Sequence, residues 1–144
     1  MLNLENGTIT LEKSGVVLSQ SLTVSEFVGK FPASQIRNSR EIGNGYVWYY
    51  FTDDLLGEPF YFSGCFSPEG YLVQINLYPD KKEVIEDKDI WSIGRLEKDK
   101  AYNDKWLLKV CGTNKTDNVY AWGRVVSCME KKGWSSHILI RYDI

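Results

Sequence analysis

The chain has 144 residues, 43% of them hydrophobic and 25% charged, which predicts one globular domain spanning residues 1–144. Its formal charge of −2, from 17 basic and 19 acidic residues, argues against a general nucleic-acid binder, because phosphate contacts require a basic excess. The three cysteines, Cys65, Cys111 and Cys128, lack CxxC spacing, so we expect reduced thiols and neither a disulfide framework nor a zinc site.

No run approaches the roughly 20 apolar residues of a membrane helix, and the first seven residues lack the features of a signal peptide. Free cysteines are typical of a reducing compartment. We therefore expect a cytoplasmic protein without a membrane span, and no motif indicates a cofactor.

The first residues predict a small hairpin followed by a short helix. Thr8–Glu12 alternates like a strand, and Val16–Ser19 returns after a Ser-Gly turn. Thr23 and Glu26 have the spacing of a capping box, which predicts a helix from about Val24 to Lys30. Apolar residues then recur at helical spacing, namely Val24, Phe27, Val28 and Phe31.

The stretch from Tyr46 to Tyr78 predicts the central antiparallel sheet. Three runs rich in aromatic and β-branched residues are separated by turn-like segments at Asp53–Gly57 and Ser67–Gly70. Ile36–Ile42, before the meander, reads as a loop or an edge strand. In the last run we expect a core-facing set made of Tyr71, Val73, Ile75 and Leu77.

The remainder predicts a helix and a closing hairpin. Pro79–Asp89 is highly charged and reads as a solvated loop. Apolar spacing around Trp106 predicts a helix from about Leu96 or Lys98 to Cys111, ended by Gly112. Two alternating runs, from Val119 to Cys128 and from Trp134 to Tyr142, predict a terminal hairpin. The fold class is therefore α+β: about six to eight antiparallel strands packed by one long and one short helix.

Catalytic signals are weak. His137 is the single histidine, so a hydrolase would have to pair it with a nucleophile such as Cys128. Two such residues facing each other across a hairpin are more often packing than catalysis. We expect a protein that is not an enzyme and has no metal site.

The functional residues suggested by the sequence are aromatic and acidic. Trp48 and Tyr50 lie on the strand face opposite Val47, Tyr49 and Phe51, so that both faces of this strand are apolar. The second face is covered core, a seam with another copy, or a binding surface. Acidic side chains near this strand and in the charged loop complete the predicted partner-binding set: Asp53, Asp54, Glu58, Glu86 and Asp87.

In this arrangement the chain resembles the small α+β immunity proteins encoded beside bacterial polymorphic and contact-dependent toxins. The resemblance rests on the first strand pair, the short helix with Phe27, the meander ending at Gly70–Leu77, and a helix containing Asp104–Leu108. It also rests on the final segments Tyr120–Ser127 and Lys132–Tyr142. No particular immunity family can be assigned.

The resemblance implies a non-enzymatic inhibitor, a monomer or weak dimer, that binds one cognate toxin domain in the cytoplasm. If that toxin is a nuclease, its basic substrate site would be complemented by the acidic loops, which would accelerate encounter. The alternative is a small-ligand-binding or homo-oligomerising α+β domain that uses the aromatic sheet face as a pocket or seam.

Overall fold

The computed structural model describes residues 1–31, 36–41, 44–80, 93–130 and 135–143, and for 36–41 it describes the backbone alone. These residues form two helices, a small two-stranded sheet and a seven-stranded antiparallel sheet, which confirms the α+β class. The elements in chain order are β1 (Ile9–Thr10), β2 (Val17–Leu18), α1 (Val24–Lys30), β3 (Ile36–Glu41), β4 (Val47–Leu55), β5 (Glu58–Phe66), β6 (Leu72–Pro79), α3 (Ile93–Cys111), β7 (Asp117–Tyr120), β8 (Gly123–Glu130) and β9 (Ser135–Tyr142).

The large sheet joins the predicted meander to the predicted terminal hairpin. Its strand order is β3-β4-β5-β6-β9-β8-β7, so that β6 and β9 form the junction between the two halves. β3 is an edge strand, as one of the two interpretations of this segment proposed. β1 and β2 pair as a separate small hairpin.

The short helix α1 has the bounds and the cap that the sequence predicts. The Glu26 N–H donates to Thr23 Oγ1 at 3.2 Å, and the Glu26 carboxylate accepts from the Thr23 hydroxyl at 2.9 Å. Phe27 is buried among aromatic rings of the sheet. Val28, which we placed in the apolar stripe, is instead 45% exposed, and the members of this stripe that are buried are Phe27 and Phe31.

The predicted core-facing set around β6 is wrong at its first two positions. Tyr71 is exposed, Val73 is only half-buried and lines a surface hollow, and Leu72 is buried instead. A bulge lets Phe66 pair with Leu72 while Cys65 pairs with Gln74, so one extra residue lies between these two pairs. The bulge reverses the alternation before Ile75 and Leu77, which are buried as expected.

The predicted strand from Val119 to Cys128 is in fact two strands. A tight turn at Ala121 and Trp122 separates β7 from β8, and Tyr120 pairs with Gly123. Gly123 has φ 152°, and a Cβ there would collide with the carbonyl of Arg141. The Trp122 indole N–H donates to the Leu4 carbonyl at 2.7 Å and ties this turn to the first residues of the chain.

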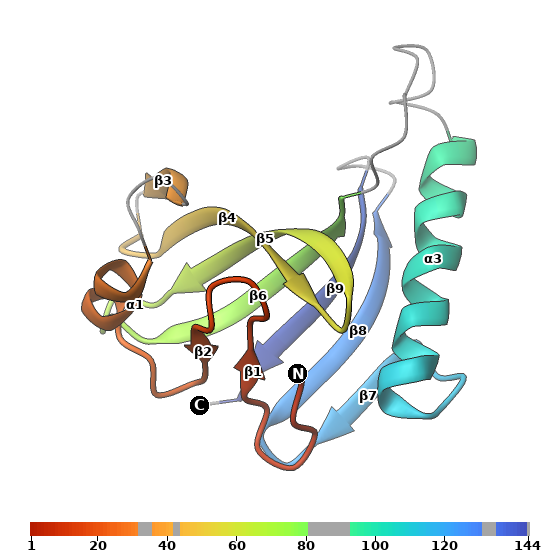
Figure 1. Cartoon of the computed structure of the whole chain (residues 1–144), viewed down its shortest axis with the longest axis horizontal. Coiled ribbons are helices and arrows are strands. Elements are labelled where there is room, and N and C mark those ends of the chain that lie inside the picture. Colours follow the sequence, from red (N-terminus) through yellow and green to blue (C-terminus); the bar gives the residue numbers. More distant parts are fainter. Residues whose placement is uncertain (32–35, 42–43, 81–92, 131–134, 144) are drawn as a thin grey trace.

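The described covering elements lie on one face of the sheet, which we call the covered face. In Figure 1, α1 and α3 stand at opposite ends of the sheet with the β1–β2 hairpin between them. Phe27 of α1 packs on Phe51, with ring centroids 5.5 Å apart. Trp106 of α3 meets Phe60 edge-on at 5.5 Å. Phe51 pairs with Phe62, and Phe60 lies two residues before Phe62 on β5. Phe51 and Phe60 therefore face the same side of the sheet.

The long helix α3 begins earlier than predicted, at Ile93, and ends at Cys111 as predicted. The Gly112 N–H donates to the Leu108 carbonyl, and Gly112 has φ 71°, a conformation that favours glycine. The Leu96 carbonyl accepts from the buried Ser136 hydroxyl of β9 at 2.7 Å. Neither described helix is long and apolar enough to cross a membrane.

Candidate binding surface on the open sheet face

Alternation along the strands turns every second side chain away from both helices. We call the surface that these side chains form the open face, because no described helix or strand packs on it. Residues in register share a face, and so the cross-strand pairs identify its members. They are Trp48, Tyr50, Thr52 and Asp54 of β4; Tyr61, Ser63 and Cys65 of β5; Gln74, Asn76 and Tyr78 of β6; His137, Leu139 and Arg141 of β9; and Arg124, Val126 and Cys128 of β8.

The open face is rich in aromatic side chains that remain accessible. Trp48, Tyr50 and Tyr78 are half-buried, and Tyr61 is 45% exposed. Trp and Tyr are residues that anchor interfaces, since each combines a large rigid apolar area with one polar group. The structure therefore places Trp48 and Tyr50 on one accessible face of the sheet.

Polar side chains link these aromatic residues. Along β6, the Gln74 amide donates to Asn76 Oδ1 at 3.1 Å, and the Asn76 amide lies 3.5 Å from the Tyr78 hydroxyl. Burial raises the pKa of Tyr78, against the opposite effect of hydrogen bonds from Ser63 and Asn76. The phenol therefore stays neutral at ordinary pH and can both donate and accept.

Cys128 and His137 are directly paired in register on this face. Burial raises the pKa of the Cys128 thiol, and burial lowers the pKa of His137, against the effect of Glu130. A thiolate–imidazolium nucleophile requires the opposite two shifts. The His137 Nδ1 atom has Ser135 Oγ 3.3 Å away, and its ring packs on Tyr78. These contacts favour packing over catalysis.

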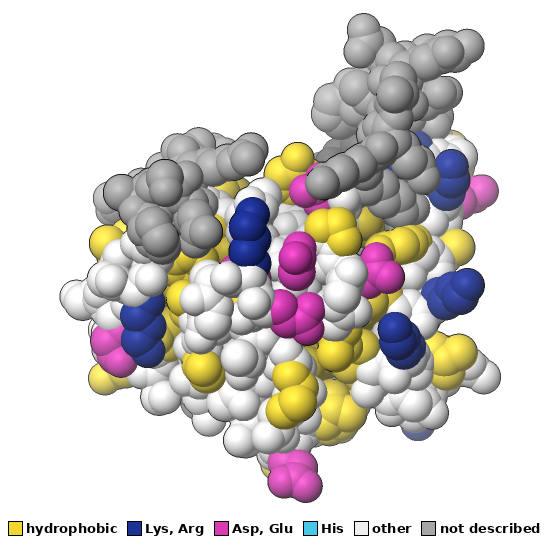
Figure 2. Space-filling model, viewed as in Figure 1, with side chains coloured by type: hydrophobic (Ala, Val, Ile, Leu, Met, Phe, Trp, Pro, Cys, Tyr) yellow, Lys and Arg dark blue, Asp and Glu magenta, His cyan; other side chains and the backbone are white. Residues whose placement is uncertain are grey.

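Asp53, a predicted partner-binding residue, faces the other way and is buried. Its carboxylate accepts from the backbone N–H groups of Lys13 at 2.8 Å and Ser14 at 3.3 Å. Only 3% of Asp53 is exposed. Glu12 reciprocates, because its carboxylate accepts from the N–H groups of Leu56 and Gly57 at 2.9 and 2.8 Å. These two carboxylates join the β1–β2 turn to the β4–β5 turn. Figure 2 shows the molecule from the covered face, with acidic side chains gathered near its centre.

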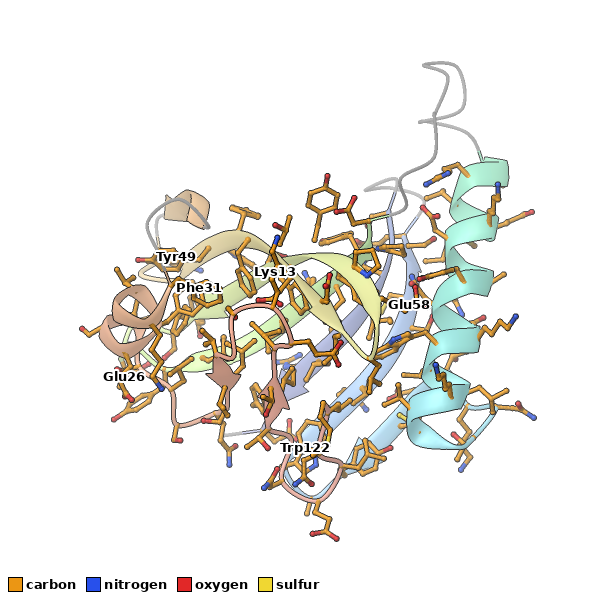
Figure 3. The ribbon with its side chains drawn as sticks, in the orientation of Figure 1. Lys13, Glu26, Phe31, Tyr49, Glu58 and Trp122 are labelled. Atoms are coloured by element: carbon orange, nitrogen blue, oxygen red, sulfur yellow. The ribbon has the colours of Figure 1, made fainter. Side chains whose placement is uncertain are left out.

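Glu58 also belongs to the covered face. Figure 3 shows it beside α3, where its carboxylate accepts from the Tyr102 hydroxyl at 2.6 Å. Burial, and then this bond, raise the pKa of Tyr102 well above its usual range. Of the predicted residues Asp53, Asp54 and Glu58, only Asp54 lies on the open face by strand alternation. Glu86 and Asp87 lie outside the described residues.

A hollow of about 560 Å³ opens at the end of the open face where β4 begins and β9 ends. Trp48, Cys65, Gln74 and Arg141 line it from four adjacent strands. Its volume falls in the usual range of small-ligand sites. No local signal in the sequence predicts this hollow, because β6 and β9 are far apart in the chain and pair only in the folded sheet. Among the described residues no group of His, Cys, Asp and Glu could hold a metal ion.

Searches with the chain found no matching protein-family model, no matching curated protein and no matching solved structure.

Proposed function

We propose that this chain is a non-catalytic binding protein of the toxin-immunity kind, and that its open face contacts a cognate toxin domain in the cytoplasm. One observation carries the proposal: both described helices cover the same side of the sheet, while the other side presents accessible tryptophan, tyrosine and arginine residues. These three residue types dominate binding energy at protein interfaces.

The polar network supports a protein partner in particular. Gln74 and Tyr78 are half-buried and are joined through the buried Asn76, so they present an amide and a hydroxyl group between the aromatic rings. Interfaces combine apolar anchors with roughly one hydrogen bond per 100–200 Å². A sheet face that is normally covered by a helix would carry fewer such groups, because each polar group must find a hydrogen-bond partner when it is buried.

The structure changes which residues this proposal uses. The sequence prediction gave acidic tips a leading role, but Asp53 and Glu58 are engaged in bonds inside the fold. We therefore assign the contact to Trp48, Tyr50 and Tyr61, with Asp54 at its margin.

The test is to look for a large secreted protein encoded immediately upstream of this chain, and to co-express the chain with the C-terminal domain of that protein. The expected result is restored growth and a stable complex. Tyr61→Ala should weaken the complex about tenfold or more. Tyr71→Ala is the matched control, because Tyr71 is equally exposed but lies beside Thr23 at the start of α1. It should change affinity by less than about twofold.

Equal effects of the two tyrosine variants, or no complex with the upstream domain, would contradict the proposal.

The second candidate function is a homo-oligomeric or ligand-binding domain, and the hollow favours ligand binding. Sedimentation distinguishes the oligomeric version, since a tight dimer that Tyr61→Ala dissociates would assign the open face to a second copy.

A further inference from the structure

The hollow is built from one row of side chains that runs straight across the sheet. Trp48 pairs with Cys65, Cys65 with Gln74, and Gln74 with Arg141. Paired residues share a face, and adjacent strands lie about 4.8 Å apart, so these four side chains are neighbours. Cys65 is the small member, and its position between Trp48 and Gln74 leaves the floor of the hollow low.

The same row carries an electrostatic conflict. Arg141 is paired directly opposite Arg124 of β8. Like charges in this arrangement destabilise a sheet. Arg124 is neutralised by Asp117, with Nη2 and Oδ2 3.5 Å apart. Arg141 lines the hollow and forms no ion pair within 4.0 Å among the described residues, so its guanidinium donors are free of a protein carboxylate there.

We propose that this hollow binds a single carboxylate attached to an aromatic or other flat apolar group. The Arg141 guanidinium matches a carboxylate through two parallel N–H donors. The Gln74 amide gives one N–H to Asn76 and retains a second for the ligand. Trp48 and Tyr46 supply an aromatic wall for the apolar group.

Two features favour a monoanion over phosphate or another dianion. Asp143 also lines the hollow and adds one negative charge near Arg141. The whole chain carries a formal charge of −2. The single Arg141 guanidinium balances one ligand charge, and the Asp143 carboxylate would repel a second. The proposal does not depend on the toxin partner, since the hollow is formed by this chain alone.

The experiment is a titration of the free ¹⁵N-labelled chain with 3-phenylpropionate, followed by NMR at the indole N–H of Trp48. The Trp48→Phe variant assigns this signal among the five tryptophans. A ligand of this size should bind with a dissociation constant on the order of 1 mM. The neutral amide, 3-phenylpropionamide, and inorganic phosphate should each bind at least about tenfold more weakly.

Variants separate charge from shape. Arg141→Gln should weaken 3-phenylpropionate at least about tenfold, and Lys109→Gln, an exposed charge on α3, should leave binding unchanged. Cys65→Leu raises the floor of the hollow while retaining every charge, and it should also weaken binding. It decides the question if Arg141→Gln fails to fold.

Three results would overturn the proposal: equal binding of the acid and its amide, tighter binding of phosphate, or full binding by both Arg141→Gln and Cys65→Leu. Because no partner protein is present, none of these results bears on the toxin-binding proposal.

Discussion

Neighbouring residues of strand β4 face opposite sides of the sheet and contribute to different parts of the molecule. On the covered face, Phe51 packs under α1 and Asp53 binds two backbone N–H groups of another hairpin. On the open face, Trp48 and Tyr50 remain half-buried, and Asp54 forms hydrogen bonds within the described residues only through its own backbone N–H and carbonyl groups. Two adjacent aspartates, Asp53 and Asp54, thus face opposite sides of the sheet and make different contacts, so residue type alone does not indicate a role here.

The largest difference in stability between the two faces is expected between the variants Phe27→Ala and Tyr50→Ala. Phe27→Ala removes a ring that packs against Phe31, Tyr49, Phe51 and Phe66, so it should lower the free energy of unfolding by about 3–5 kcal/mol. Tyr50→Ala should cost about 1 kcal/mol or less, since part of its ring already meets water.

Urea unfolding of the two variants measures this contrast directly. Equal losses would mean that the open face is packed as tightly as the covered face, and the binding-surface account would lose its basis.

The adjacent aspartates provide the second contrast. Asp53→Ala leaves three backbone N–H groups, those of Lys13, Ser14 and Asp54, without this acceptor, so it should lower the free energy of unfolding by about 1–3 kcal/mol. Asp54→Ala should change it by less than about 0.5 kcal/mol. The same urea titration measures both, and a larger loss from Asp54→Ala would show that we have assigned the two side chains to the wrong faces.

His137 gives the smallest effect and tests whether the open face is partly desolvated. Burial lowers its pKa below the usual value of about 6.5. The unfolded chain therefore takes up this proton first as pH falls. The contribution of His137 to stability is complete above about pH 6.5 and is lost as pH falls through the lowered pKa. Glu130 opposes the shift, and the neighbours Tyr78 and Cys128 are neutral in this range.

The measurement compares the parent chain with His137→Gln at pH 7.5 and pH 5.0. The parent should lose more stability between these pH values than the variant, because carboxylate titration is common to both. Parallel losses would indicate that the imidazole is fully hydrated.

Local signals in the sequence were sufficient to predict much of the fold. The capping box at Thr23 and Glu26, the tight turn at Ser67–Gly70, and Gly112 each act within a few residues. Their hydrogen bonds join groups that are close in the chain, so a pattern reveals them. Alternation likewise placed Trp48 and Tyr50 opposite Tyr49 and Phe51.

Long-range partners could not be predicted in this way. The acceptor role of Asp53 depends on backbone groups 39 and 40 residues away, so the sequence shows only an acidic turn. The bulge at Val73 and the turn at Trp122 interrupt alternation without a clear break in composition. The hollow needs β9 beside β6, which is a property of the topology and not of any motif.

Hydroxyl-radical footprinting, on the free chain and on its complex with the proposed toxin partner, tests the central claim most directly. The account predicts that Trp48, Tyr50 and Tyr61 are oxidised in the free chain and protected in the complex. Tyr71 should be oxidised equally in both. Protection of Tyr71 with continued oxidation of Tyr61, or an open face that is already unreactive in the free chain, would contradict the account.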